Sequence, residues 1–103
     1  MSQLAFRALA DTTRRDILMM LRGKELTIAE IAENFEMTRA AVKKHLVMLL
    51  EGGLIVSKVK GRTRVNALDP QGMAPIVDWL SFFDSYWDDH LSQLKEAIEK
   101  DNS

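Results

Sequence analysis

Basic side chains are concentrated in the middle of this 103-residue chain. Between residues 38 and 64 the only acid is Glu51, and the whole chain has a formal net charge of −1. The basic residues of this segment are Arg39, Lys43, Lys44, Lys58, Lys60, Arg62 and Arg64. The excess of positive charge is therefore local. It favours a polyanionic partner, because clustered cations attract phosphate groups.

Side chains that could perform catalysis are scarce. The chain has no cysteine, and its two histidines, His45 and His90, lie far apart in the sequence. This composition excludes a disulfide framework and a thiolate metal site. No glycine-rich loop of the phosphate-binding kind is present. We therefore expect no enzyme, no catalytic residues and no cofactor.

Acidic side chains lie mainly in the last third of the chain. Residues 1–64 carry 12 basic and 7 acidic side chains, and residues 65–103 carry 2 basic and 8 acidic ones. This division predicts two surfaces with different tasks. The length fits a single domain over residues 1–103. No apolar run approaches ~20 residues and the N-terminus shows no secretory signal, so we expect a cytoplasmic protein.

Two short helices joined by a tight turn are predicted to position the basic residues, over about residues 27–51. Thr27 and Glu30 have the spacing of a capping box, in which each side chain reaches a free backbone N–H of the first turn. Thr38 is a suitable N-cap for the second helix, and the Gly52–Gly53 pair ends it. The pattern is typical of a helix-turn-helix.

A β-hairpin is predicted to follow, over about residues 54–68. Residues 54–59 are rich in β-branched side chains, Lys60-Gly61-Arg62 supplies a turn, and residues 63–68 return as a second strand. A helix-turn-helix followed by a basic hairpin indicates a winged helix-turn-helix. We therefore predict a mainly α fold with a small β-hairpin, which dimerises through its terminal helices.

The second helix of the motif has one apolar face and one small or basic face. Val42, Leu46 and Leu49 share the apolar face, whereas Lys43 and Lys44 lie opposite. Small and basic residues suit a DNA groove, although a solvated helix face and a charged strand edge are the alternatives for the helix and hairpin. The predicted DNA-binding residues are Thr38, Arg39, Ala40, Lys43, Lys44, Lys60, Arg62 and Arg64.

A long apolar stripe marks the C-terminal region. Asp69-Pro70 predicts a helix start and Pro75 a restart, after which the pattern is helical to about residue 100. Apolar residues then recur every three or four positions, as in a heptad seam. We predict a dimerisation helix over about 75–100, although packing on the protomer's own core and an aromatic pocket for an apolar ligand are alternatives. The predicted dimerisation residues are Leu80, Phe83, Trp87, Leu91 and Leu94.

Four stretches resemble the ArsR/SmtB family of bacterial winged-helix repressors. Residues 6–18, FRALADTTRRDIL, resemble the family's opening stretch, with Thr12 where proline is common. Residues 27–32, TIAEIA, resemble the first motif helix, and residues 38–46, TRAAVKKHL, resemble the recognition helix. Arg39 and Lys43 stand where small polar residues are common. The sequence GLIV at 53–56 resembles the entry to the wing.

The resemblance implies a homodimer that represses transcription at an operator with two-fold symmetry and is released by an inducer, often a metal ion. One metal site of the family needs cysteines, which this chain lacks. The other pairs Asp-x-His with two ligands about eleven residues further on in the partner. Asp88-Asp89-His90 matches the first half, but only Asp101 stands near the second. We therefore predict no metal site and interpret His90 as solvated and His45 as structural.

The sequence thus predicts a sequence-specific DNA-binding transcriptional regulator that acts as a homodimeric repressor released by an unknown inducer. The expected partners are a double-stranded DNA operator, a second copy of the chain and a small-molecule inducer, with no membrane. The alternative is a winged-helix protein–protein interaction module without DNA binding. Such a module should present exposed aromatic residues on its second motif helix rather than Lys43 and Lys44.

Overall fold

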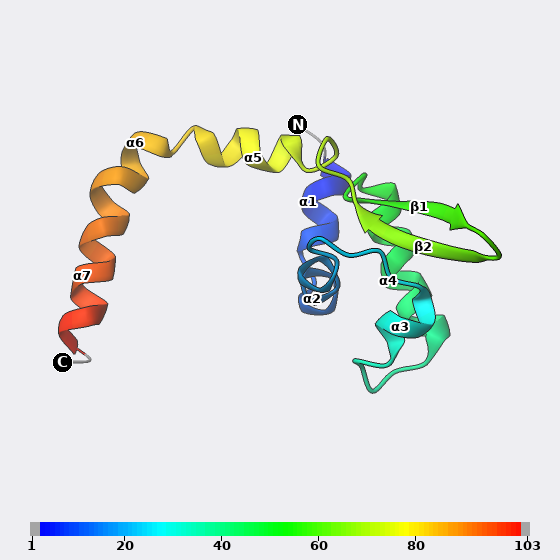
Figure 1. The fold of residues 1–103 in the computed structure, drawn as a ribbon. Coiled ribbons are helices and arrows are strands. Elements are labelled where there is room, and N and C mark those ends of the chain that lie inside the picture. The colour runs from blue at the N-terminus through cyan, green and yellow to red at the C-terminus, as the bar shows by residue number, and fades with distance from the viewer. Residues whose placement is uncertain (1–2, 102–103) are drawn as a thin grey trace.

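The computed structural model describes residues 3–101, except for the side chains of Leu91 and Asp101. Four helices come first, then a two-stranded hairpin, then a C-terminal arm of helical segments (Figure 1). The mainly α fold with a small hairpin is confirmed. The elements are α1 (Gln3–Leu9), α2 (Thr12–Met20), α3 (Ile28–Ala32), α4 (Arg39–Glu51), β1 (Ile55–Lys60), β2 (Thr63–Leu68), α5 (Ala74–Ser81), α6 (Asp84–Tyr86), the π-helix η1 (Trp87–Leu91) and α7 (Ser92–Asp101).

Side-chain caps fix where three of the helices begin. Asp11 caps α2, since its Oδ2 accepts a hydrogen bond from the backbone N–H of Arg14 at 3.0 Å. The capping box at α3 is formed: Thr27 N–H donates to Glu30 Oε1 at 2.9 Å, and Glu30 N–H donates to Thr27 Oγ1 at 3.1 Å. Thr38 Oγ1 accepts from the N–H of Ala41 at 3.1 Å and so caps α4. The predicted starts of both motif helices are confirmed.

The hairpin pairs in antiparallel register from Ile55 opposite Leu68 to Lys60 opposite Thr63. Its two-residue turn begins at Gly61, whose φ of 66° is typical of a type II′ turn and is disfavoured for residues with a side chain. A third segment joins β2 from the other side. Leu26 and Asn66 exchange two backbone hydrogen bonds of 3.0 and 2.7 Å, and this bridge holds the chain before α3 against the hairpin.

The hydrophobic core lies where α1–α4 meet the base of the hairpin. Its largest fully buried side chains come from α2, α3, α4 and β1 and from the turns that follow α2 and α4. The α4 residues Val42 and Leu49 are fully buried, and Leu46 nearly so. Helix α4 is therefore fixed on its apolar face, which orients its other face outward. The fully buried large side chains are Ile17, Leu21, Ile31, Val42, Leu49, Leu54 and Ile55.

The predicted helix start at Asp69-Pro70 is wrong. Asp69 Oδ1 accepts a hydrogen bond from the N–H of Gln71 at 3.1 Å, and residues 70–73 form turns instead. Helix α5 begins at Ala74, with Pro75 in its first turn, where the missing N–H costs no helical hydrogen bond. The predicted restart near Pro75 is therefore where the helix begins.

The arm, residues 74–101, is helical over the predicted range, but it is not one continuous helix. Residues 82–83 form a turn between α5 and α6, and η1 widens the helix before α7. Ser81 Oγ donates to the carbonyl of Asp78 at 2.6 Å, a side-chain bond that competes with the helical ladder and bends helices. Figure 1 shows the arm turning sharply after α5. The heptad seam expected along one helix therefore does not run straight.

The arm also makes the molecule elongated. The radius of gyration is 16.8 Å, compared with roughly 13 Å for a compact domain of this length. The principal extents are 51 × 34 × 22 Å. In Figure 1, α5 leaves the body beside α1, and α6 and α7 project away from it. The side chains of the distal arm are therefore exposed to solvent on several sides.

Candidate nucleic-acid interface

Helix α4 presents the predicted residues to solvent. The residues of its first two turns that sequence analysis assigned to DNA are all exposed, whereas Val42 and Leu46 point into the core. The exposed residues are Thr38, Arg39, Ala40, Lys43 and Lys44. The N–H groups at the start of this helix carry a partial positive charge, which favours an anion near Arg39. The exposed α4 face therefore suits a phosphate backbone.

The basic side chains of the hairpin differ in whether they already pair with an acidic side chain. Lys58 Nζ and Lys60 Nζ both contact Glu25, at 2.9 and 2.8 Å. These two hydrogen bonds and charges lower the pKa of Glu25 to about 2, with Lys60 contributing most. Lys60 is thus exposed but already shares a carboxylate. Arg62 lies exposed beside the turn glycine at the tip.

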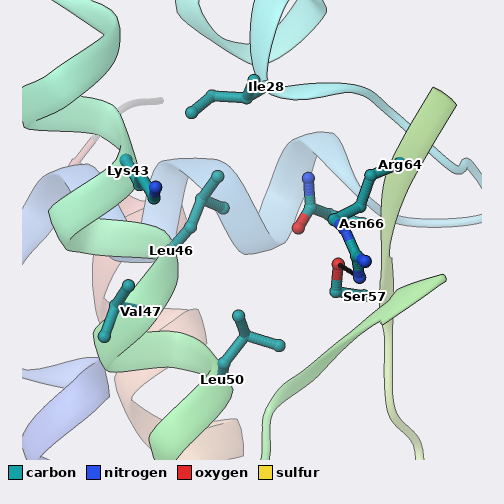
Figure 2. Close-up of a pocket in the computed structure, with 8 residues that line it drawn as sticks. All are labelled: Ile28, Lys43, Leu46, Val47, Leu50, Ser57, Arg64 and Asn66. Atoms are coloured by element: carbon teal, nitrogen blue, oxygen red, sulfur yellow. Dashed lines mark hydrogen bonds between the residues drawn. The ribbon is translucent and has the colours of Figure 1, made fainter. Parts of the chain in front are cut away.

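The hairpin and α4 also share a pocket, shown in Figure 2. Lys43 of α4 and Arg64 of β2 both line this pocket, which has a volume of about 280 Å³. Arg64 Nη1 donates to Ser57 Oγ at 3.1 Å across the hairpin. Two of the predicted DNA-binding cations, separated by 21 positions in sequence, are therefore brought to one site. We call the exposed residues 38–44 of α4 together with the hairpin cations the cationic surface.

His45 connects α4 to the start of α2. Its Nδ1 lies 3.7 Å from Asp11 Oδ2 and 3.4 Å from Arg14 Nη1. Arg14 in turn donates to the carbonyls of Ala8 at 2.7 Å and Arg7 at 3.0 Å. The backbone N–H of Arg14 holds the pKa of Asp11 below its ordinary value. This polar cluster ties three helices together and supports the structural interpretation of His45.

Sequence reasoning missed Glu25 as a partner of the hairpin. The two Lys–Glu pairs join residues 33 and 35 positions apart, a separation at which sequence spacing carries no signal. Glu25 is close to the hairpin because its neighbour Leu26 is bonded to Asn66 of β2. The charge pattern indicates Glu25 as a partner of the hairpin only when the pairing of Leu26 with Asn66 is known.

The predicted dimerisation residues lie along the arm. Leu80, Phe83, Trp87 and Leu94 are all exposed, and the side chain of Leu91 lies outside the described residues. A series of aromatic contacts continues from the body along the arm. Phe6 of α1 packs edge-on against Trp79 at 5.8 Å, followed by Trp79–Phe83 at 5.3 Å and Phe83–Trp87 at 5.9 Å between ring centroids.

His90, on the acidic end of the arm, contacts Tyr86 in two ways. The His90 ring stacks on Tyr86 at 4.2 Å between centroids, and its Nδ1–H donates to the carbonyl of Tyr86 at 3.1 Å. Among residues whose positions the structure describes, no group of three or more His, Cys, Asp or Glu side chains could hold a metal ion. Within residues 3–101, no helix has the length and apolar character to span a bilayer.

Comparison with known proteins gives consistent matches. Residues 11–57 match the family described as "Bacterial regulatory protein, arsR family". The chain is 34% identical to the HTH-type transcriptional regulator Rv2034 of Mycobacterium tuberculosis, over 94% of this chain and 88% of that protein. It is 30% identical to the transcriptional repressor SdpR of Bacillus subtilis, over 84% and 96%. A crystal structure titled "Possible transcriptional regulator for arsenical resistance" superposes with a TM-score of 0.68 and 36% identity, covering 94% and 96%.

Proposed function

Because this chain belongs to the ArsR family of bacterial regulatory proteins and is a DNA-binding transcriptional regulator, we propose that it acts as a homodimeric repressor. In this proposal α4 enters the major groove of an operator, and the hairpin contacts the adjacent backbone. An inducer of unknown identity releases the DNA. The protein acts in the cytoplasm, where its operator would lie.

The observation that carries the proposal is the arrangement of α4. Its apolar face is buried against the core, and its exposed face carries Arg39, Lys43 and Lys44 without an acidic neighbour in the first two turns. Ala40 leaves room for the close approach of a base edge. Lysines at this position can contact phosphates or guanine edges. The exposed face of α4 therefore serves as the recognition surface.

The hairpin adds phosphate contacts beside the helix. Arg64 lines the same pocket as Lys43, so the two side chains flank a single groove of the protein. Arg62 extends from the tip of the hairpin, where it can reach the neighbouring backbone or minor groove. Lys60 contributes less than the sequence suggested, since it already pairs with Glu25.

Dimerisation is supported by the exposed apolar side chains of the arm. Phe82 is 75% exposed, Leu94 56% and Tyr86 52% in the single chain. Such a surface is unfavourable in water and is typical of an interface. Two copies joined through their arms would place their α4 helices on successive major grooves, about 34 Å apart. The acids of the arm then remain distant from the DNA.

The alternative of a protein-interaction module without DNA binding is less well supported by α4. Within residues 39–51 the exposed face contains no aromatic side chain, whereas hot spots of protein interfaces are enriched in Trp and Tyr. Exposed aromatic residues are found instead on the arm. In this proposal the exposed face of α4 binds DNA and the arm mediates self-association.

The test is fluorescence anisotropy with labelled DNA from the promoter region of the protein's own gene and with random DNA of equal length. We expect tighter binding to the promoter and a loss of roughly tenfold or more for Lys43→Ala and for Arg62→Ala, as phosphate and base contacts disappear. Lys95→Ala, an exposed lysine of the arm, is the matched control and should bind as the wild type does. Equal affinity for promoter and random DNA would contradict operator recognition.

A further inference from the structure

We propose that the pocket between α4 and the hairpin binds a small amphipathic carboxylate, and that this ligand and operator DNA exclude each other. The inference rests on the proposed function, because it assigns the regulation of that same DNA-binding surface. The pocket has a volume of about 280 Å³ and is lined by Ile28, Lys43, Leu46, Val47, Leu50, Ser57, Arg64 and Asn66.

One wall of the pocket is apolar. Figure 2 shows Leu46 and Leu50 directed from successive turns of α4 toward the hairpin, with Ile28 of α3 at one end, and Val47 also lines the pocket. Val47 and Leu50 are 40% and 38% exposed, although they are large aliphatic residues. An apolar ligand group would cover this wall and remove it from water, which is the main source of affinity in such sites.

Two cations from different elements flank the apolar wall. Lys43 comes from α4 and Arg64 from β2, and both line the pocket. Among the described residues the side chain of Lys43 has no hydrogen-bond or ion-pair partner, so its ammonium group is available. Arg64 uses Nη1 to donate to Ser57 Oγ at 3.1 Å, which leaves its other N–H groups for a ligand. A carboxylate fits a guanidinium and an ammonium better than any neutral group does.

The buried side chain of Asn66 supplies a further polar contact. Asn66 is 6% exposed, and its Nδ2 donates to the carbonyl of Leu26 at 3.2 Å. Figure 2 shows its amide oxygen directed toward the α4 side of the pocket. Within the described part of the chain this oxygen accepts no hydrogen bond. It can therefore accept one from a ligand hydroxyl or amide, as is typical of a binding pocket.

The size of the pocket limits the ligand. A volume of 280 Å³ is at the small end of ligand sites and fits roughly ten to twelve non-hydrogen atoms. A nucleotide is too large and too polar for this apolar wall. An aryl-alkyl or medium-chain carboxylic acid matches both the length and the charge distribution. Such a ligand would neutralise Lys43 and Arg64, which the proposed DNA contact also requires, and hence the two compete.

The first test is an NMR titration of the full isotope-labelled chain without DNA. The probe is 4-phenylbutyrate, and the control is its neutral analogue 4-phenylbutyramide. We expect shifts concentrated at Leu46, Val47, Leu50 and Ser57, and binding of the amide at least roughly tenfold weaker because the charge-assisted hydrogen bonds are lost. Shifts spread over the surface, or equal binding of the amide, would overturn the proposal.

A variant separates the pocket from the DNA contacts. Leu50→Phe fills the pocket from α4, and Ile28→Phe fills it from α3 in case the first variant does not fold. We expect each to weaken 4-phenylbutyrate binding at least roughly tenfold. Met19→Phe enlarges an exposed residue outside the pocket and is the control. Unchanged binding in a folded pocket variant would overturn the assignment.

Competition is then measured with operator DNA. At tenfold excess over its own Kd, 4-phenylbutyrate should raise the Kd for DNA about 11-fold for each subunit that must release it. Pocket binding with unchanged DNA affinity would overturn the competition. A chain that binds 4-phenylbutyrate in the pocket but no operator would instead contradict the proposed function and leave the ligand site supported, so the two failures are distinguishable.

Discussion

Glu25 lowers the positive charge that the hairpin offers to DNA. Its carboxylate lies 2.9 Å from Lys58 Nζ and 2.8 Å from Lys60 Nζ, and these contacts stabilise the charged form strongly enough to lower its pKa to about 2. The acid is therefore ionised at every pH at which DNA binding would be measured. In the proposed complex both lysines must share their charge between Glu25 and phosphate.

Removal of this carboxylate should strengthen DNA binding. Glu25→Gln keeps the shape of the side chain and removes the negative charge that pairs with Lys58 and Lys60, so operator affinity should rise roughly fivefold, with a steeper dependence on salt. Fluorescence anisotropy at several salt concentrations measures both quantities. Glu99→Gln, on the arm, is the control and should change neither. A decrease in affinity for Glu25→Gln would mean that Glu25 positions the hairpin rather than masking it.

Residues that act on their near neighbours in sequence were predictable, and residues that act across the fold were not. Thr27, Glu30 and Thr38 cap helices through contacts three positions away, so the sequence alone identified them. The pairing of Glu25 with Lys60 depends on the bridge between Leu26 and Asn66, which no spacing rule predicts. The same is true of the contact between Asp11 and His45.

At the scale of elements, the hairpin is an independent part of the proposed interface. Its tip needs Gly61 at a φ of 66°, whereas its base is held by the core residues Leu54 and Ile55. Gly61→Val should cost about 1–2 kcal/mol locally, because a residue with a Cβ is strained in this region. The tip would adopt another turn while the base stays packed.

The expected result for Gly61→Val is a weakened operator complex on a folded protein. Anisotropy should show a severalfold loss of DNA affinity, and hydrogen exchange should show lower protection of the strand residues next to the turn. Amides of α4 should keep their protection, since Val42 and Leu49 remain buried. Loss of protection in α4 as well would contradict an independently held hairpin.

Element boundaries were predictable where a cap or a glycine sets them and uncertain where side chains alter a helix internally. The arm illustrates the second case. Ser81 donates to the carbonyl of Asp78, and His90 of η1 donates to the carbonyl of Tyr86 in α6. Both are side-chain donations to the backbone, and neither changes the apolar periodicity that predicted a continuous helix.

At the scale of the whole molecule, the arm separates an apolar surface from the cationic surface. The elongated shape, with a radius of gyration of 16.8 Å, leaves exposed the aromatic residues that a compact domain would cover. The sequence predicted the stripe but could not show which of its residues the protomer itself would bury. Among the apolar residues of the arm, Ile76 is buried, whereas Leu94 and Ile98 are more than half exposed.

A charge on this surface should separate the proposed dimer. In Leu94→Glu the new carboxylates of two copies would be desolvated and close together, so the protein should become monomeric at micromolar concentration in analytical ultracentrifugation. Operator affinity should fall roughly 100-fold or more, since each copy then binds a half-site alone. Met19→Glu, an exposed position on α2, is the control. A wild-type chain that is already monomeric would contradict the dimer.

The salt dependence of operator binding tests the central claim most directly, since it counts the phosphates that the cationic surface neutralises. Each phosphate contact contributes about −0.9 to the slope of the logarithm of the binding constant against that of salt concentration. If Lys43 contacts phosphate once in each of two subunits, Lys43→Ala should make the slope shallower by about 2. An unchanged slope together with an unchanged affinity would contradict the placement of α4 on the DNA, and a change of about 1 would contradict the presence of two copies.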